Sequence, residues 1–234
     1  VGFNTTFSDV GKGATEAVAG LGALGVGFTG AAKLIADNSN VVATAGFGRF
    51  QDTMKFAADT SEELGMSFKD SMNQFADGMS RRQSVMDLSN VSQKSLTGTI
   101  QGTVTAQRVY SQALGVSSTH LEQFVDNLIR SSGALTASLL TMNNGIRNQV
   151  VGGIEVFASG LAALGGPAGQ GIAEAFTEAA SKGAIGLSDE AIGYVTALPS
   201  LQGPMNDYIQ AVQSGTLTQE EAKNMVTDLT MNLG

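Results

Sequence analysis

The chain of 234 residues contains no cysteine, no tryptophan and only three prolines. Because cysteine is absent, disulfides, thiolate-bound metals and a cysteine nucleophile are excluded. Charged residues make up only 15% of the chain, whereas they make up roughly a quarter of ordinary soluble domains. Hydrophobic residues still reach 42%, so the chain has enough apolar side chains to build a core.

Positive charge is also scarce, since 13 Lys and Arg residues stand against 21 Asp and Glu residues and give a net charge of −8. Binding to nucleic acid requires a basic surface that neutralises phosphates, so we expect no sequence-specific nucleic-acid binding. The nearest candidate for such a surface is Arg81-Arg82, which we expect on a solvated helix face.

Residue types that carry out catalysis are sparse. No motif places an aspartate to orient the only histidine, His120, which we interpret as a surface or satisfied side chain. The acidic pairs Glu62-Glu63, Asp189-Glu190 and Glu220-Glu221 fall in expected first helical turns, where they complement the helix dipole. Overlapping G-x-G-x-x-G patterns between Gly20 and Gly30 lack the preceding strand of a dinucleotide site. We therefore expect no enzyme, no metal site and no cofactor.

Glycine, in contrast, is abundant at 30 residues, and it recurs in a tetrapeptide pattern. The three copies are Leu64-Gly65-Met66-Ser67, Leu114-Gly115-Val116-Ser117 and Ile185-Gly186-Leu187-Ser188. Glycine adopts the left-handed conformation that closes a helix, and serine accepts a free backbone N–H at the start of the next helix. We expect a helix boundary at each joint, with positive φ at Gly65, Gly115 and Gly186. The serines expected at helix N-caps are Ser67, Ser117 and Ser188.

A looser fourth copy is Gly215-Thr216-Leu217-Thr218, with Glu221 at the capping-box position. No segment alternates apolar and polar residues as a half-buried strand does. The expected fold is therefore all-α, a multi-helix chain hinged at glycines with no sheet. We divide it into a Gly/Ala-rich apolar helix (1–40), a helical segment with a Met/Phe stripe (41–130) and a long helix followed by short helices (131–234).

The first segment carries an apolar stretch from about Gly13 to Ala36. Its small residues recur every four positions, at Thr15, Ala19, Ala23, Gly27 and Ala31. Such a stripe lets two helix backbones approach closely, either in a tight soluble bundle or in a membrane. The uncharged centre, Ala17 to Ala32, is slightly shorter than the 18 or so residues expected of a membrane span. A buried bundle helix and a membrane-active helix are both compatible with this pattern.

Two apolar stripes at helical spacing are expected to pack into a core. The first comprises Leu64, Phe68, Met72, Phe75 and Met79. This stripe is also compatible with a groove for a partner helix, because Met-rich faces repack easily. The second has a mean spacing of about 3.6 residues and predicts one amphipathic helix of about 30 residues. Its members are Leu135, Leu139, Met142, Ile146, Val150, Ile154, Phe157, Leu161 and Leu164.

Breaker residues predict where these helices stop. We expect the long helix to end at Gly165-Gly166-Pro167-Ala168-Gly169, a run that helix interiors rarely accept, with short helices after it. Residues 80–113 are polar, with widely spaced apolar side chains, and predict a weaker helix pair broken near Ser89–Ser92.

From about Thr60 to its end the chain resembles the helical, non-enzymatic parts of phage tail tape measure proteins. The resemblance rests on the glycine–serine joints, the run Phe157–Gly165, the segment from Ile185 to Tyr194 and the ending from Gly215 to Glu221. It implies a virion component that packs inside the tail or at its tip, with copies of itself and with tail-tube or tail-tip proteins. It also implies release during infection, contact with the host membrane and help in genome delivery.

One feature departs from a tape measure rod. A molecular ruler needs a long uninterrupted helix, whereas this chain is interrupted every few turns. Within such a family we therefore expect the compact or membrane-active part. Two alternatives stay open: a pore-forming or membrane-remodelling helical protein, based on Ala17–Ala32, and a non-enzymatic helical scaffold or adaptor.

Overall fold

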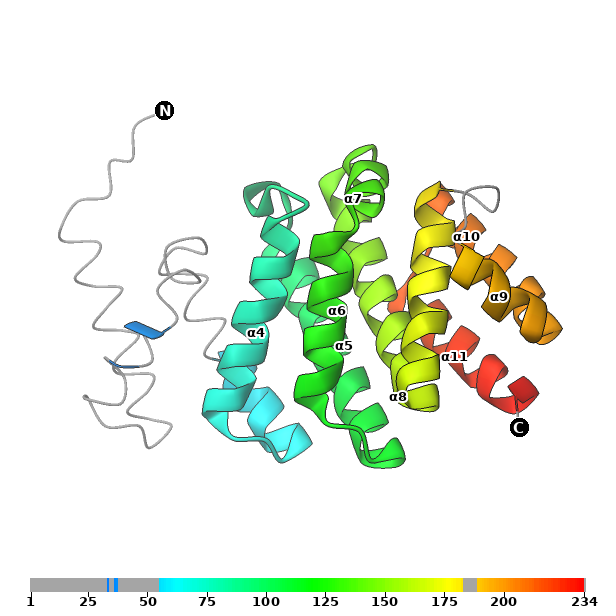
Figure 1. Cartoon of the computed structure of the whole chain (residues 1–234). Helices are drawn as coiled ribbons and strands as arrows, with labels where there is room; N and C mark the ends of the chain where they lie inside the picture. Colours follow the sequence, from blue (N-terminus) through cyan, green and yellow to red (C-terminus); the bar gives the residue numbers. More distant parts are fainter. Residues whose placement is uncertain (1–32, 34–35, 38–54, 183–188, 234) are drawn as a thin grey trace. The chain divides into compact units, whose positions relative to one another are not determined.

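A computed structural model describes residues 33, 36–37, 55–182 and 189–233 of the chain (Figure 1). Every element within these ranges is a helix and none is a strand, which confirms the all-α prediction. No helix in the described ranges is both long enough and apolar enough to cross a membrane. The stripe from Thr15 to Ala31 and the joint at Gly186 and Ser188 lie outside the described residues.

The described residues fall into two units, divided between Ser80 and Arg81. In the first unit, a helix at residues 55–64 is followed by α4 (Phe68–Gln83), which continues across the division. The three segments expected from the sequence stay a prediction.

The first joint has the predicted conformation. Gly65 has φ of 60°, which a residue with a Cβ rarely adopts. Ser67 Oγ accepts a hydrogen bond from the Asp70 N–H at 3.0 Å and donates one to the Asp70 carboxylate at 2.6 Å. Ser67 therefore caps the start of α4.

The Met/Phe stripe of α4 is buried at Met72, Phe75 and Met79, as expected for a core face. The centroid of the Phe75 ring lies 4.9 Å from that of the Phe56 ring, on the preceding helix. This tilted aromatic pair holds the two helices of the joint together within the first unit.

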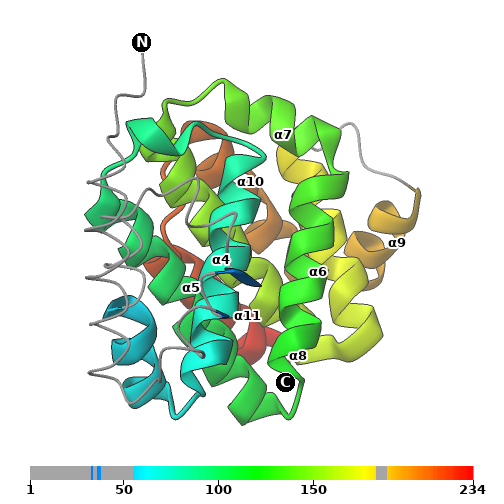
Figure 2. The ribbon, with the colours of Figure 1, turned by 90° about the vertical axis from the view of Figure 1, so that its left-hand side faces the viewer.

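The second unit consists of helices in the order η1 (Leu88–Asn90), α5 (Gln93–Leu114), α6 (Ser118–Ser131), α7 (Gly133–Leu140), α8 (Asn144–Lys182), α9 (Asp189–Ala197), η3 (Pro199–Leu201), α10 (Gln202–Ser214) and α11 (Gln219–Leu233). Figure 2 shows α7 turning away from the upper end of α6. The break expected near Ser89–Ser92 is confirmed. Ser92 Oγ accepts the Ser95 N–H at 3.2 Å and caps α5 there.

Two further joints lie in this unit. Gly115 has φ of 70° and closes α5, and Ser117 is the N-cap residue of α6, although its side chain makes no capping hydrogen bond. Gly215 has φ of 73° and closes α10. Thr218 Oγ1 then accepts the Glu221 N–H at 3.1 Å, while the Glu221 carboxylate accepts the Thr218 N–H at 2.8 Å. This pair forms the reciprocal capping box that the sequence predicted.

The prediction of one helix from Leu135 to Leu164 is wrong, because the chain breaks between α7 and α8. The first of these helices ends at Leu140, and the second begins at Asn144. Asn143 Oδ1 accepts the Ile146 N–H at 3.0 Å and so starts α8 as a cap. Asparagine side chains compete for nearby backbone groups in this way, and here that local hydrogen bond outweighs the apolar period.

Arg147 stabilises this break by binding carbonyl groups at the end of α7. Its Nε donates to the Leu139 carbonyl oxygen at 2.7 Å, and its Nη2 donates to the Leu140 carbonyl oxygen at 3.0 Å. Its Nη1 donates to the Val85 carbonyl oxygen at 2.6 Å. A buried guanidinium group therefore replaces the hydrogen bonds that a continuing helix would have made.

The 39-residue α8 is helical throughout, yet it reverses direction near its middle (Figure 1). The centroids of the Phe157 and Phe176 rings lie 5.1 Å apart. In a straight helix these two residues would be separated by about 28 Å, at 1.5 Å of rise per residue. The backbone at Gly169 also approaches the Leu161 carbonyl so closely that a Cβ there would clash. The helix expected to end at Gly165–Gly169 therefore folds back there as a hairpin.

We call residues 144–164 the first arm of α8 and residues 170–182 its second arm. The first arm is the centre of the unit, because every residue from Val150 to Ala163 is buried. Neighbouring segments approach it at glycines: a Cβ added at Gly153 would lie 2.8 Å from the side chain of Leu217, in the connection between α10 and α11. Part of the high glycine content is thus explained by close packing around the first arm.

Candidate functional site

One charged side chain lies inside the enclosed stretch of the first arm, that of Glu155. Arg81 Nε donates to its Oε1 at 2.9 Å, and Arg82 Nη2 donates to its Oε2 at 2.7 Å. Thr103 Oγ1, from α5, donates to Oε2 at 2.8 Å. The solvated face expected for the two arginines is therefore wrong, since their exposed fractions are 2% and 0%.

The charges of this cluster control its protonation. Burial raises the pKa of Glu155, but the charges of Arg82 and Arg81 and their hydrogen bonds outweigh burial and hold this pKa below its ordinary value. Burial likewise lowers the pKa of Arg82, and the Glu155 carboxylate opposes that effect. Removal of the carboxylate would leave two buried cations without a counter-ion, so Glu155 is expected to be essential to the core.

Polar side chains continue the cluster along α5 and the first arm. Asn148 Nδ2 donates to the Thr99 hydroxyl at 3.0 Å, and Gln107 Nε2 donates to the Ser159 hydroxyl at 3.1 Å. Both contacts advance along the two helices in step with the Thr103 contact, so α5 and the first arm run in the same direction. This buried network fixes the register of the two helices, which is a structural role.

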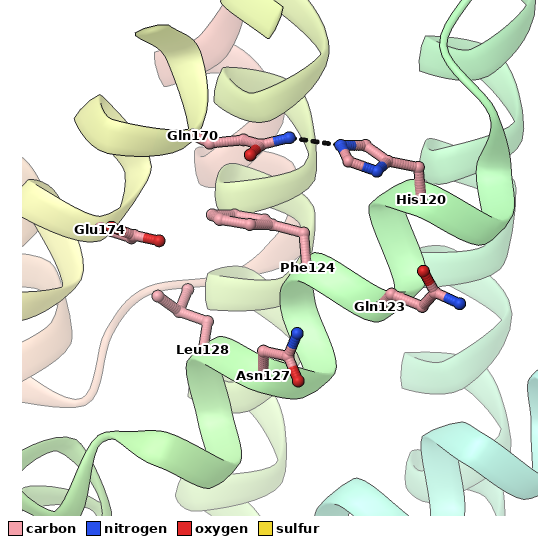
Figure 3. Close-up of a pocket in the computed structure, with 7 residues that line it drawn as sticks. All are labelled: His120, Gln123, Phe124, Asn127, Leu128, Gln170 and Glu174. Atoms are coloured by element: carbon pink, nitrogen blue, oxygen red, sulfur yellow. Dashed lines mark hydrogen bonds between the residues drawn. The ribbon is translucent and has the colours of Figure 1, made fainter. Parts of the chain in front are cut away.

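An open cavity of about 320 Å³ lies at the surface of the same unit, between α6 and the second arm of α8 (Figure 3). The residues that α6 contributes are three or four positions apart and share one helix face. They are His120, Gln123, Phe124, Asn127 and Leu128. The second arm contributes Gln170 and Glu174, one turn apart. We call this cavity the α6–α8 groove and treat it as the candidate functional site.

One end of the groove is closed by a contact between His120 and Gln170, drawn as a dashed line in Figure 3. The amide Nε2 of Gln170 lies against the imidazole Nε2 of His120, so the two side chains bridge the walls of the groove. His120 is exposed and hydrogen-bonded, as the sequence led us to expect.

The apolar side of the groove is anchored in the core. Phe124 is half-buried and packs against a buried cluster formed by Leu121, Ala162 and Ala163. Figure 3 shows its side chain reaching from α6 toward the second arm, between His120 and Leu128. Because the cluster includes first-arm residues, the first arm positions the α6 wall, and the reversal of α8 brings the second arm opposite it.

The groove contains groups suited to binding rather than to reaction. Among the described residues that line the groove there is no hydroxyl or thiol side chain. Its only carboxylate is that of Glu174. Within the part of the chain that the structure describes, no three His, Cys, Asp or Glu residues form a group that could hold a metal ion.

Sequence reasoning missed both the Glu155 cluster and the groove. The α6 wall could have been found, since His120, Phe124 and Leu128 recur at a helical spacing of four. The opposite wall could not, because it depends on the reversal of α8. Similarly, nothing in the sequence pairs Arg81 with an acid 74 residues away. The joint residues Gly115 and Ser117 lie outside the groove lining and serve to start the helix that forms its wall.

Comparisons of the chain with known protein families, with curated proteins and with solved structures found no match.

Proposed function

We propose that this chain is a structural, non-enzymatic virion component of the phage tail tape measure type, packed inside the tail or tail tip. In this proposal it leaves the particle during infection and assists genome delivery across the host membrane. The observation that carries the proposal is the glycine joint, the feature on which the sequence resemblance rests. It recurs in the described helices with positive φ at Gly65, Gly115 and Gly215.

The shape of the second unit supports the compact part of such a protein over its rod. The helix with the most residues, α8, folds back on itself so that Phe157 contacts Phe176. A ruler would gain length from a straight helix, at about 1.5 Å per residue, and lose it in a hairpin. A folded unit of this kind suits a position at one end of a tail, in contact with copies of itself and with tail-tube or tail-tip proteins.

The test is a protease-protection experiment on tailed particles made from the parent reading frame. Mass spectrometry should find peptides of α5 and α11 in purified particles, and external trypsin should not remove them. After DNA ejection is triggered, the same peptides should become sensitive to trypsin or leave the particle. Absence of these peptides from washed particles would overturn the proposal.

A second candidate, a pore-forming or membrane-remodelling protein, is favoured by the stripe of small residues from Thr15 to Ala31. Isolated full-length chain should then release dye from liposomes. Replacement of Ala23 and Gly27 together by leucine should reduce the release, because close helix packing is blocked while hydrophobicity is kept. Equal leakage by both proteins would show that the stripe has no role in membrane permeabilisation. No leakage by the parent chain would contradict the pore-forming function.

A further inference from the structure

We propose that the α6–α8 groove is a carbohydrate-binding site that takes one neutral sugar unit. This inference is independent of the virion proposal, because it rests on the residues that line the groove. These residues are His120, Gln123, Phe124, Asn127, Leu128, Gln170 and Glu174.

The size of the groove sets the size of its ligand. A cavity of about 320 Å³ lies near the lower end of the range that small-molecule sites occupy, roughly 300–1,000 Å³. A single ring with its substituents fits such a volume, whereas a nucleotide or a folded peptide segment would extend well beyond it. The open side of the groove leaves room for a sugar that is part of a longer chain.

The charge of the lining excludes anionic ligands. Glu174 carries the only full charge among the lining residues, and no arginine or lysine is among them. A phosphate or carboxylate would lose its hydration without gaining a cationic partner and would be repelled by Glu174. The ligand is therefore neutral or cationic, and it exchanges hydrogen bonds with uncharged groups.

The polar groups of the groove match vicinal hydroxyls. Gln123, Asn127 and Gln170 each present an amide that both donates and accepts, and Glu174 accepts through two oxygens. A sugar hydroxyl also donates and accepts, so two adjacent hydroxyls can each form a hydrogen bond with one of the two polar atoms of such a side chain.

An apolar surface completes the match. Phe124 and Leu128 lie between the polar side chains, as Figure 3 shows. The C–H face of a sugar ring is apolar and packs against an aromatic side chain, while its edge carries the hydroxyls. Phe124 is already held by the core, so little side-chain freedom is lost when a ligand binds.

The test uses the full-length chain with defined probes: glucose, galactose and N-acetylglucosamine as sugars, choline as a cation and inorganic phosphate as an anion. Saturation-transfer NMR and titration should detect at least one sugar, at an affinity of about 1 mM for a half-open site of this size. Phosphate should give no signal. Saturable binding of choline alone, lost in Glu174→Gln, would overturn the proposal and assign a cation site. Absence of any saturable sugar signal would overturn it as well.

Two exposed groove residues allow matched variants. Asn127→Ala and Gln123→Ala should each weaken sugar binding by roughly tenfold, because a hydrogen-bonded partner is removed. Gln112→Ala, at an exposed position of α5 outside the groove, should leave the affinity unchanged. Circular dichroism checks that all three variants fold. Equal affinity in the groove variants and the control would show that the sugar binds elsewhere.

Discussion

The two arms of α8 place the same kind of side chain in opposite settings. Glu155, in the first arm, is fully buried against two arginines, whereas Glu174, in the second arm, is exposed at the groove. The Glu155 carboxylate is paired with Arg81 and Arg82, whereas the Glu174 carboxylate lines the groove. The surroundings of each position in α8, and not the residue type, therefore decide which acid lies in the core and which lies at the surface.

The largest loss of stability is expected when the buried acid, Glu155, is removed. Glu155→Ala leaves Arg81 and Arg82 buried without their counter-ion, and should lower the free energy of unfolding by about 3–5 kcal/mol. Urea denaturation followed by circular dichroism measures this loss. The triple variant Arg81→Met, Arg82→Leu, Glu155→Met should recover much of it, because no unpaired charge remains. A loss below 1 kcal/mol in Glu155→Ala would contradict the assignment.

Glycine substitutions compare a buried position of the first arm with an exposed position of α5. Gly153→Ala should lower the free energy of unfolding by about 1–3 kcal/mol, because its Cβ would lie 2.8 Å from the Leu217 side chain. Gly98→Ala is the control, since Gly98 lies at an exposed position of α5 and a Cβ there meets nothing within 4 Å. It should be neutral or stabilise by up to about 1 kcal/mol, as alanine favours helices. Thermal unfolding measures the change in stability of both variants, and equal changes would contradict close packing at Gly153.

The pH dependence of stability should follow the buried acid. The pKa of Glu155 is lower in the folded protein than in the unfolded chain, so its stabilisation is present above the ordinary glutamate pKa of about 4.3. As the pH falls from there through the folded-state pKa, this stabilisation should be lost. Urea midpoints between about pH 3 and pH 7 measure the decline.

Two variants separate this contribution from that of other acids. The pKa of Asp87 is also lowered, by hydrogen bonds from Ser89, but its side chain is exposed. Asp87→Asn should therefore keep most of the acid sensitivity, whereas Glu155→Gln should lose much of it. The same pH profile in Glu155→Gln as in the parent chain would show that the buried acid does not control it.

The smallest effect is expected at the open acid. Glu174→Gln should change the free energy of unfolding by less than about 0.5 kcal/mol, because an exposed side chain without a core role is replaced by one of the same shape. Chemical denaturation of Glu174→Gln and Glu155→Gln compares the losses in the free energy of unfolding that the two acids cause. A loss of 2 kcal/mol or more at Glu174 would mean that the groove is part of the folded core.

Local signals in the sequence predicted much of the fold. The joints at Gly65, Gly115 and Gly215 followed from capping chemistry that acts within a few residues, which is why a sequence shows it. The break before α8 could also have been predicted from Asn143 and the residues after it. The regular spacing of apolar residues concealed this break, because Leu135 and Leu139 would be buried both in one continuous helix and in a separate α7.

Long-range features could not be predicted in this way. The breaker run Gly165–Gly169 indicates a stop, but it does not tell whether the next helix turns aside or folds back against the first. That choice depends on packing between side chains such as Phe157, Phe176 and Tyr208, which are far apart in sequence. The two groove walls and the burial of Arg82 follow from it.

The reversal of α8 is the central claim, since it creates both the enclosed core and the open groove. The most direct measurement is a ring-to-ring nuclear Overhauser effect between Phe157 and Phe176 in chain with labelled phenylalanine, using Phe176→Leu for assignment. Rings with centroids 5.1 Å apart should give a strong cross-peak that the variant lacks. A straight helix would hold these residues about 28 Å apart, and the absence of any cross-peak between them in the folded chain would contradict the account.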